Sequence, residues 1–145
     1  MDVNAAQSAW DFFLSGYLFT VCVETPILLL GLSPRHSWGR RLFCGVWLNA
    51  CSYPVVALVL PMLIDIKDQR WLYLLVAEIF APIAECALFW AAFGTRAEWG
   101  TRSMWRDFAV ITLANLASFA PAEIVLQLHL HDSLPPWIEQ FFPHE

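Results

Sequence analysis

Four long apolar runs constrain this chain more than any other feature of its sequence. They cover residues 12–32, 42–64, 71–93 and 108–128. Each is close to the ~20 residues that a helix needs to cross the hydrocarbon core of a bilayer, and none alternates as a strand would. The chain is 59% hydrophobic and 14% charged, whereas soluble domains average about 45–50% apolar and about 25% charged residues. We therefore predict a single all-α integral membrane domain, residues 1–145, with four transmembrane helices.

The arginines predict how these helices are oriented. Most of the 8 basic residues lie in the first and third loops, as Arg35, Arg40, Arg41, Arg96, Arg102 and Arg106. The positive-inside rule places these loops in the cytoplasm and both termini outside. Tryptophans mark the two interfaces, with Trp10, Trp71 and Trp137 outside and Trp38, Trp99 and Trp105 inside. We expect a bacterial inner (cytoplasmic) membrane protein whose tail, residues 133–145, lies on the outer surface as an interfacial segment.

One polar motif occurs twice inside the apolar runs. The first copy is NACSYP, beginning at Asn49, and the second is NLASFAP, beginning at Asn115. Both copies lie at equivalent places in the second helix of a predicted hairpin. The first helices correspond as well, because Glu24 and Glu85 each precede an arginine-rich loop by about the same distance. The sequence therefore predicts two tandem helical hairpins, repeated in parallel orientation about an axis along the membrane normal.

The depths of these four residues coincide. At a rise of ~1.5 Å per residue, Asn49 lies ~12 Å inward from Arg41, and Asn115 lies ~13 Å inward from Arg106. Glu24 and Glu85 lie ~13–15 Å from the starts of their loops by the same rise. We call Glu24, Asn49, Glu85 and Asn115 the Glu/Asn layer. Four helices thus contribute one polar side chain each to a layer on the cytoplasmic side of the mid-bilayer.

Further polar groups extend this layer toward the outside. Glu78 lies two helical turns before Glu85, and Glu123 lies about two turns after Asn115. The serines of the two motif copies lie close to these positions. We call the set of Glu78, Glu123, Ser52 and Ser118 the predicted seam. Each predicted span also contains a proline, at Pro26, Pro54, Pro82 and Pro121. A proline removes one helical hydrogen bond and frees a carbonyl oxygen. Carboxylates, amides and free carbonyls together suit protons or hard cations.

The layer has two interpretations. Buried carboxylic acids and amides can simply hold helices together, since interhelical hydrogen bonds contribute roughly 0.6–2 kcal/mol each. An ionisable residue at the centre of a membrane helix costs about 2.5–3.5 kcal/mol, however, and such residues commonly mark proton or ion pathways. The sequence leaves both interpretations open, with the functional one favoured.

No enzyme or cofactor motif is present, so we predict no catalytic residues and name no cofactor. The four cysteines lie within the spans and are expected to pack as small apolar side chains. His129, His131 and Asp132 are weak candidates for a divalent metal, and a solvated turn is favoured over a metal site there.

The function predicted from these features is proton- or cation-linked transport, with the Glu/Asn layer as the site. We expect a homo-oligomer or a larger membrane partner in the lipid bilayer, and no nucleic acid. The first alternative is a non-catalytic accessory or assembly subunit that docks a larger membrane protein through the same layer. A lipid-modifying enzyme is the weaker alternative.

Overall fold

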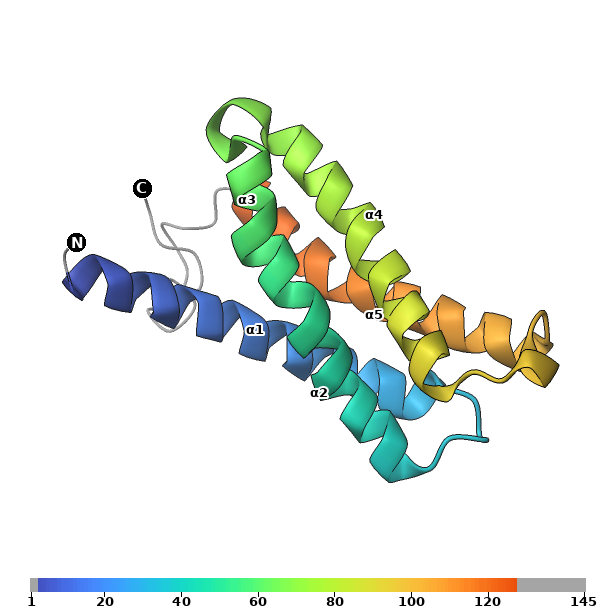
Figure 1. Ribbon diagram of the computed structural model, residues 1–145. Helices are drawn as coiled ribbons and strands as arrows, with labels where there is room; N and C mark the ends of the chain where they lie inside the picture. Colours follow the sequence, from blue (N-terminus) through green and yellow to red (C-terminus); the bar gives the residue numbers. More distant parts are fainter. Residues whose placement is uncertain (1–2, 128–145) are drawn as a thin grey trace.

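The computed structural model describes residues 3–127, apart from the side chains of residues 3–9, 11, 12, 66, 67 and 120–127. Within this range the protein is helical and has no strand (Figure 1). Its elements are α1 (Val3–Gly31), α2 (Trp38–Pro54), the π-helical segment η1 (Val55–Val59), α3 (Leu60–Leu63), α4 (Ile66–Phe93), the 3₁₀ turn η2 (Arg96–Glu98) and α5 (Arg102–Gln127). Helices are expected here because lipid offers no partner for backbone N–H and C=O groups.

Three stretches are long and apolar enough to cross a membrane, namely Phe13–Gly31, Trp38–Leu63 and Asp68–Phe93. They correspond to the first three predicted spans. The prediction of an all-helical membrane protein is confirmed in this form. Residues 108–127 of the fourth predicted span, 108–128, lie in α5, which is not among the three stretches found in the described residues. The count of four spans and the tandem repeat stay predictions.

The second span is one rod built from α2, η1 and α3, and its π-helical segment lies between two prolines. In η1 the N–H of Leu60 bonds to the carbonyl of Val55, five residues back. Pro61 follows and has no N–H to continue this register, so the carbonyl of Val56 lacks its helical partner. The hydroxyl of Tyr73 on α4 donates to that carbonyl at 3.2 Å. The prolines thus change the helical register without breaking the rod.

The long helices pack in a ring. The helices α1 and α4 both contact α2 and α5, so each hairpin packs against the other (Figure 1). Close approach of α1 to α2 depends on Gly45, since a Cβ there would lie 2.5 Å from the hydroxyl oxygen of Thr25. Small residues at helix crossings are typical of membrane bundles.

The helix that contains most of the fourth predicted span begins before that span. The predicted span starts at residue 108, and α5 begins at Arg102. Thr101 explains the earlier start, because its side-chain oxygen accepts the N–H of Met104 at 3.3 Å, as an N-cap threonine does. Arg102, Arg106 and Asp107 therefore lie on a helix.

Candidate functional site

The Glu/Asn layer exists as two hydrogen-bonded pairs. The amide of Asn49 donates to Glu24 Oε2 at 2.9 Å, and the amide of Asn115 donates to Glu85 Oε2 at 2.8 Å. Each pair joins the two helices of one hairpin. Both asparagines also donate to a carbonyl four residues back, that of Gly45 for Asn49 and of Ile111 for Asn115. These second bonds fix the direction in which each amide points.

The two serines join one hairpin to the other. Ser118 on α5 lies 2.7 Å from Glu24 Oε1, and Ser52 on α2 lies 2.6 Å from Glu85 Oε1. Each serine lies three residues after the asparagine of its own helix, so the two side chains share one helix face. Every carboxylate oxygen in the layer therefore has a partner, one from its own hairpin and one from the other.

The layer is enclosed by protein. The side chains of Glu24, Asn49 and Glu85 are each 1% exposed, and Ser52, Asn115 and Ser118 are buried as well. The structure brings the four predicted residues together through these hydrogen bonds, and their positions along the sequence alone did not reveal the pairing. Their role stays a hypothesis, because hydrogen bonding is required of any buried polar group.

The apolar core lies between the layer and the arginine-rich ends of the helices. It consists of Leu28, Leu32, Cys44, Leu48, Phe89, Ile111 and Ala114. Leu28 and Phe89 each follow a layer glutamate by one helical turn, and Ile111 precedes Asn115 by one turn. This core separates the layer from the loops at that end.

A second buried polar group, the Asp107 cluster, closes the arginine-rich end. We define it as Ser33, Arg35, His36, Glu98 and Asp107. Asp107 is fully buried. Its carboxylate accepts the N–H of Ser33 at 2.6 Å, the hydroxyl of Ser33 at 2.9 Å and Arg35 Nη2 at 3.0 Å. His36 Nε2 lies 3.1 Å from the same carboxylate.

Arg35 extends the cluster to the other loop through an ion pair with Glu98. The hydrogen bond from Arg35 lowers the pKa of the Glu98 carboxyl. Burial lowers the pKa of His36, against the raising effect of its contact with Asp107. Both arginine-rich loops therefore lie at the same end of the molecule, as the predicted topology requires, and they are held to each other.

Two further arginines cap the end of the first helix. Arg41 donates to the carbonyls of Leu29, Ser33 and His36. Arg106 donates to the carbonyl of Gly31 at 3.0 Å. The sequence interpretation of these arginines as topology signals missed this structural role. One signal was available: Arg41 and Asp107 each lie eight residues before a layer asparagine.

The remaining predicted residues do not join the layer. Glu78 is half-buried on α4 and forms no hydrogen bond or ion pair with any described residue. The side chain of Glu123 lies outside the described residues, as do His129, His131 and Asp132. Within the described part of the chain, no group of three or more His, Cys, Asp or Glu side chains is arranged to hold a metal ion.

Comparison with known proteins identifies no relative. No family model matches the chain, and neither a curated protein nor a solved structure is significantly similar to it.

Proposed function

We propose that this protein is a proton- or cation-linked membrane transporter, and that the Glu/Asn layer carries the proton or the cation. One observation carries the proposal: Glu24 and Glu85, both buried, are each shared between the two hairpins. Buried membrane carboxylates are costly and typically mark ion or proton sites. Because Glu24 and Glu85 each bond to both hairpins, binding of a proton or cation to these carboxylates is linked to the packing of one hairpin on the other.

The two kinds of bond suggest how such a layer works. The Glu–Asn bonds lie within a hairpin and survive a rigid movement of one hairpin against the other. The Ser–Glu bonds cross between hairpins and break in that movement. Transporters built from repeats commonly alternate access by rocking one unit against another around a fixed midplane site. The twofold pattern of Glu, Asn and Ser partners supports the tandem repeat and this type of motion.

The packing on the two sides of the layer supports an assignment of the conformation that the structure represents. The apolar core and the Asp107 cluster cover the layer from the arginine-rich end, which the topology assigns to the cytoplasm. Toward the other end, Tyr53, Tyr73 and Glu78 are only half-buried. We interpret the structure as the conformation closed to the cytoplasm. Opening toward the cytoplasm then requires Ser33, Arg35 and His36 to leave Asp107, Arg35 to leave Glu98, and Arg106 to leave the carbonyl of Gly31.

The serine contacts accommodate a proton. A hydroxyl both donates and accepts hydrogen bonds. Ser118 can therefore accept a hydrogen bond from protonated Glu24 while its own O–H donates to the carbonyl of Asn115, 2.9 Å away. A protonated Glu24 thus keeps all its hydrogen bonds. A cation would instead bind the carboxylate oxygens directly, as hard cations do, and would displace the serine and amide donors.

The alternatives have less support. The layer is buried inside the bundle, so it is not presented to a docking partner as the accessory-subunit alternative needs. For the lipid-modifying alternative, the described residues contain no group of three or more His, Cys, Asp or Glu side chains that could hold a metal ion. A homo-oligomer is part of the transport proposal, with its interface unassigned.

The test uses purified protein in liposomes that contain a pH-sensitive dye. An imposed potassium diffusion potential should drive proton entry through the wild type, and Na⁺ and K⁺ gradients test the cation branch. Glu24→Gln and Glu85→Gln keep the size and hydrogen bonding of a protonated glutamate but carry no exchangeable acid proton. We expect both variants to retain wild-type thermal stability in detergent and to reduce flux to the level of empty liposomes.

Leucine variants provide the matched control. Glu24→Leu leaves one N–H of the Asn49 amide without its acceptor, while Asn49 still donates to the carbonyl of Gly45 and Ser118 still donates to that of Asn115. One unsatisfied buried group costs about 1–3 kcal/mol. We therefore expect Glu24→Leu to be less stable than Glu24→Gln. Fully active glutamine variants, or a wild type that passes neither protons nor the cations tested, would contradict the transport proposal and favour the interpretation of the layer as structural.

A further inference from the structure

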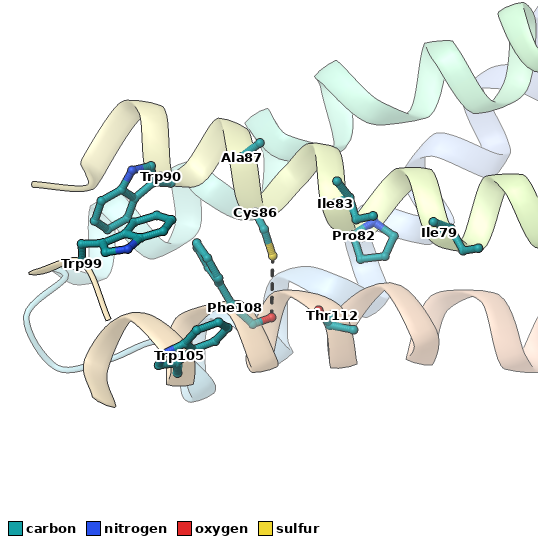
Figure 2. A pocket seen from close by; sticks show the side chains of 10 residues that line it. All are labelled: Ile79, Pro82, Ile83, Cys86, Ala87, Trp90, Trp99, Trp105, Phe108 and Thr112. Carbon is teal, nitrogen blue, oxygen red and sulfur yellow. Dashed lines mark hydrogen bonds between the residues drawn. The ribbon is translucent and has the colours of Figure 1, made fainter. Parts of the chain in front are cut away.

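An apolar groove of about 650 Å³ runs between α4 and α5 on the outside of the bundle (Figure 2). This volume lies within the roughly 300–1,000 Å³ typical of small-molecule sites. Its lining, which includes Ala87, is mostly apolar, and its polar groups are the thiol of Cys86, the hydroxyl of Thr112 and the indole N–H groups of three tryptophans. We call it the Trp groove.

Three indoles define one end of the Trp groove. Trp90 and Trp99 meet edge to face with ring centroids 5.2 Å apart, and the ring of Phe108 lies 6.2 Å from that of Trp105. Figure 2 shows these rings at one end and Ile79 at the far end of the groove, along the length of α4. Trp99 and Trp105 belong to the arginine-rich end, where tryptophans mark the level of the lipid headgroups. The groove therefore extends from a membrane interface into the hydrocarbon region.

Two exposed arginines, Arg96 and Arg102, lie close in sequence to the tryptophans at this end of the groove, although neither lines it. Arg102 lies one helical turn before Trp105, on the same face of α5 and nearer the interface. Arg96 belongs to η2, and the backbone carbonyl of Arg96 accepts the N–H of Trp99. Both arginines are exposed, and neither forms an ion pair with a described residue. Basic pockets between membrane helices on the cytoplasmic side bind anionic headgroups.

We propose that the Trp groove is a binding site for one anionic glycerophospholipid of the leaflet that faces the arginine-rich loops. An acyl chain occupies the apolar groove from the indoles to Ile79, and the phosphate pairs with Arg96 and Arg102. The charge of the two arginines selects this occupant over a zwitterionic lipid, and the position of the tryptophan end at the interface selects a lipid over a hydrophobic helix.

The test measures lipid retention by native mass spectrometry of the full chain in detergent. The probes are dioleoyl phosphatidylglycerol and dioleoyl phosphatidylcholine, which share their chains and differ in headgroup charge. One basic residue near an anionic surface gives about a fivefold preference, so we expect the wild type to bind one phosphatidylglycerol at least about fivefold more tightly. Arg102→Gln should reduce that preference, and Ala87→Phe, which fills the groove, should abolish the site for both lipids.

Leu113→Phe is the matched control, because Leu113 is exposed on α5 but does not line the groove. It should bind as the wild type does. A second measurement does not depend on the groove-filling variant: brominated phosphatidylglycerol should quench the indole fluorescence saturably at a low mole fraction, and Arg102→Gln should shift that saturation upward. Equal affinity for the two lipids, or unchanged retention in a folded Ala87→Phe protein, overturns the proposal.

Discussion

At the level of single residues, Asp107 shows how a buried charge is tolerated in this protein. Its carboxylate is surrounded by the N–H and hydroxyl of Ser33, the guanidinium of Arg35 and the ring of His36. Removing one partner of a buried pair typically costs about 3–5 kcal/mol, because the other charge is left uncompensated. The Asp107 cluster therefore ties the first loop to the start of α5.

The histidine of this cluster predicts a pH dependence of stability. Arg35 and Arg40 face the ring as well as Asp107, and burial keeps the pKa of folded His36 below its ordinary value of 6.5. The folded protein thus binds fewer protons than the unfolded chain in this pH range. The contribution of neutral His36 to stability is complete above about pH 6.5 and is lost as the pH falls below it.

His36→Gln tests this dependence, since glutamine keeps a hydrogen-bonding group that does not titrate. We expect the thermal midpoint of the wild type in detergent to fall between about pH 7.5 and about pH 5.5. The fall should be smaller in His36→Gln. Parallel curves for the two proteins would show that other groups, rather than His36, cause the pH dependence.

The residues of the Glu/Asn layer could be predicted from the sequence, whereas their cross-hairpin partners could not. The rise of a helix converts sequence distance into depth, and depth placed Glu24, Asn49, Glu85 and Asn115 together. It gives no information on which helices are neighbours or on how each is rotated. The contacts of Ser52 and Ser118 depend on both. Asp107 was missed for the same reason, because its partner Ser33 lies 74 residues away in the chain.

At the level of elements, the closeness of α1 and α2 depends on a glycine. Gly45 faces Thr25, and a Cβ at Gly45 would lie 2.5 Å from the threonine hydroxyl and 2.9 Å from its Cβ. The sequence located both helices but gave no reason to single out this glycine. Similarly, the prolines of the second span predicted a disturbed helix, but the sequence did not show that Tyr73 on α4 donates to the carbonyl of Val56.

Gly45→Ala tests whether helix packing or helix propensity has the larger effect on stability at this position. The added methyl group pushes α1 away from α2, and overpacking of this kind typically costs about 1–3 kcal/mol. We expect a lower thermal midpoint in detergent, although alanine favours helices. Gly39→Ala is the control within the same helix, because no atom lies within 4 Å of a Cβ there. A Gly45→Ala protein as stable as Gly39→Ala would mean that α1 and α2 separate without cost.

At the level of the whole molecule, two polar groups and one apolar block are stacked along the bundle. The Asp107 cluster lies at the arginine-rich end of the bundle, the apolar core comes next, and the Glu/Asn layer lies farthest from that end. The hairpins are therefore joined at two levels along the bundle, by the Ser–Glu contacts and by the contacts of the first loop with Asp107 and Glu98. A transport cycle of the proposed kind has to release both sets of contacts, and their different depths allow them to be released in sequence.

The last prediction concerns how this stack is placed across the membrane. The ion pair of Arg35 with Glu98 joins the first and third loops at one end, so any valid topology has these loops on one side and the 64–66 turn on the other. The positive-inside rule makes the arginine-rich side cytoplasmic. Reporter fusions after Trp38 and Gly100 should therefore report the cytoplasm, and fusions at Ile66 and at both termini should report the outside.

Removing two of the loop arginines makes this experiment sharper. Arg96 and Arg102 form no ion pair with a described residue, so changing both to glutamine removes topological charge with little effect on the packed contacts. Because Arg35, Arg40 and Arg41 remain, we expect the same orientation with some loss of uniformity in the Gly100 fusion. A cytoplasmic Ile66 fusion would invert the molecule, place the Asp107 cluster outside, and reverse the direction in which the proposed transporter is closed.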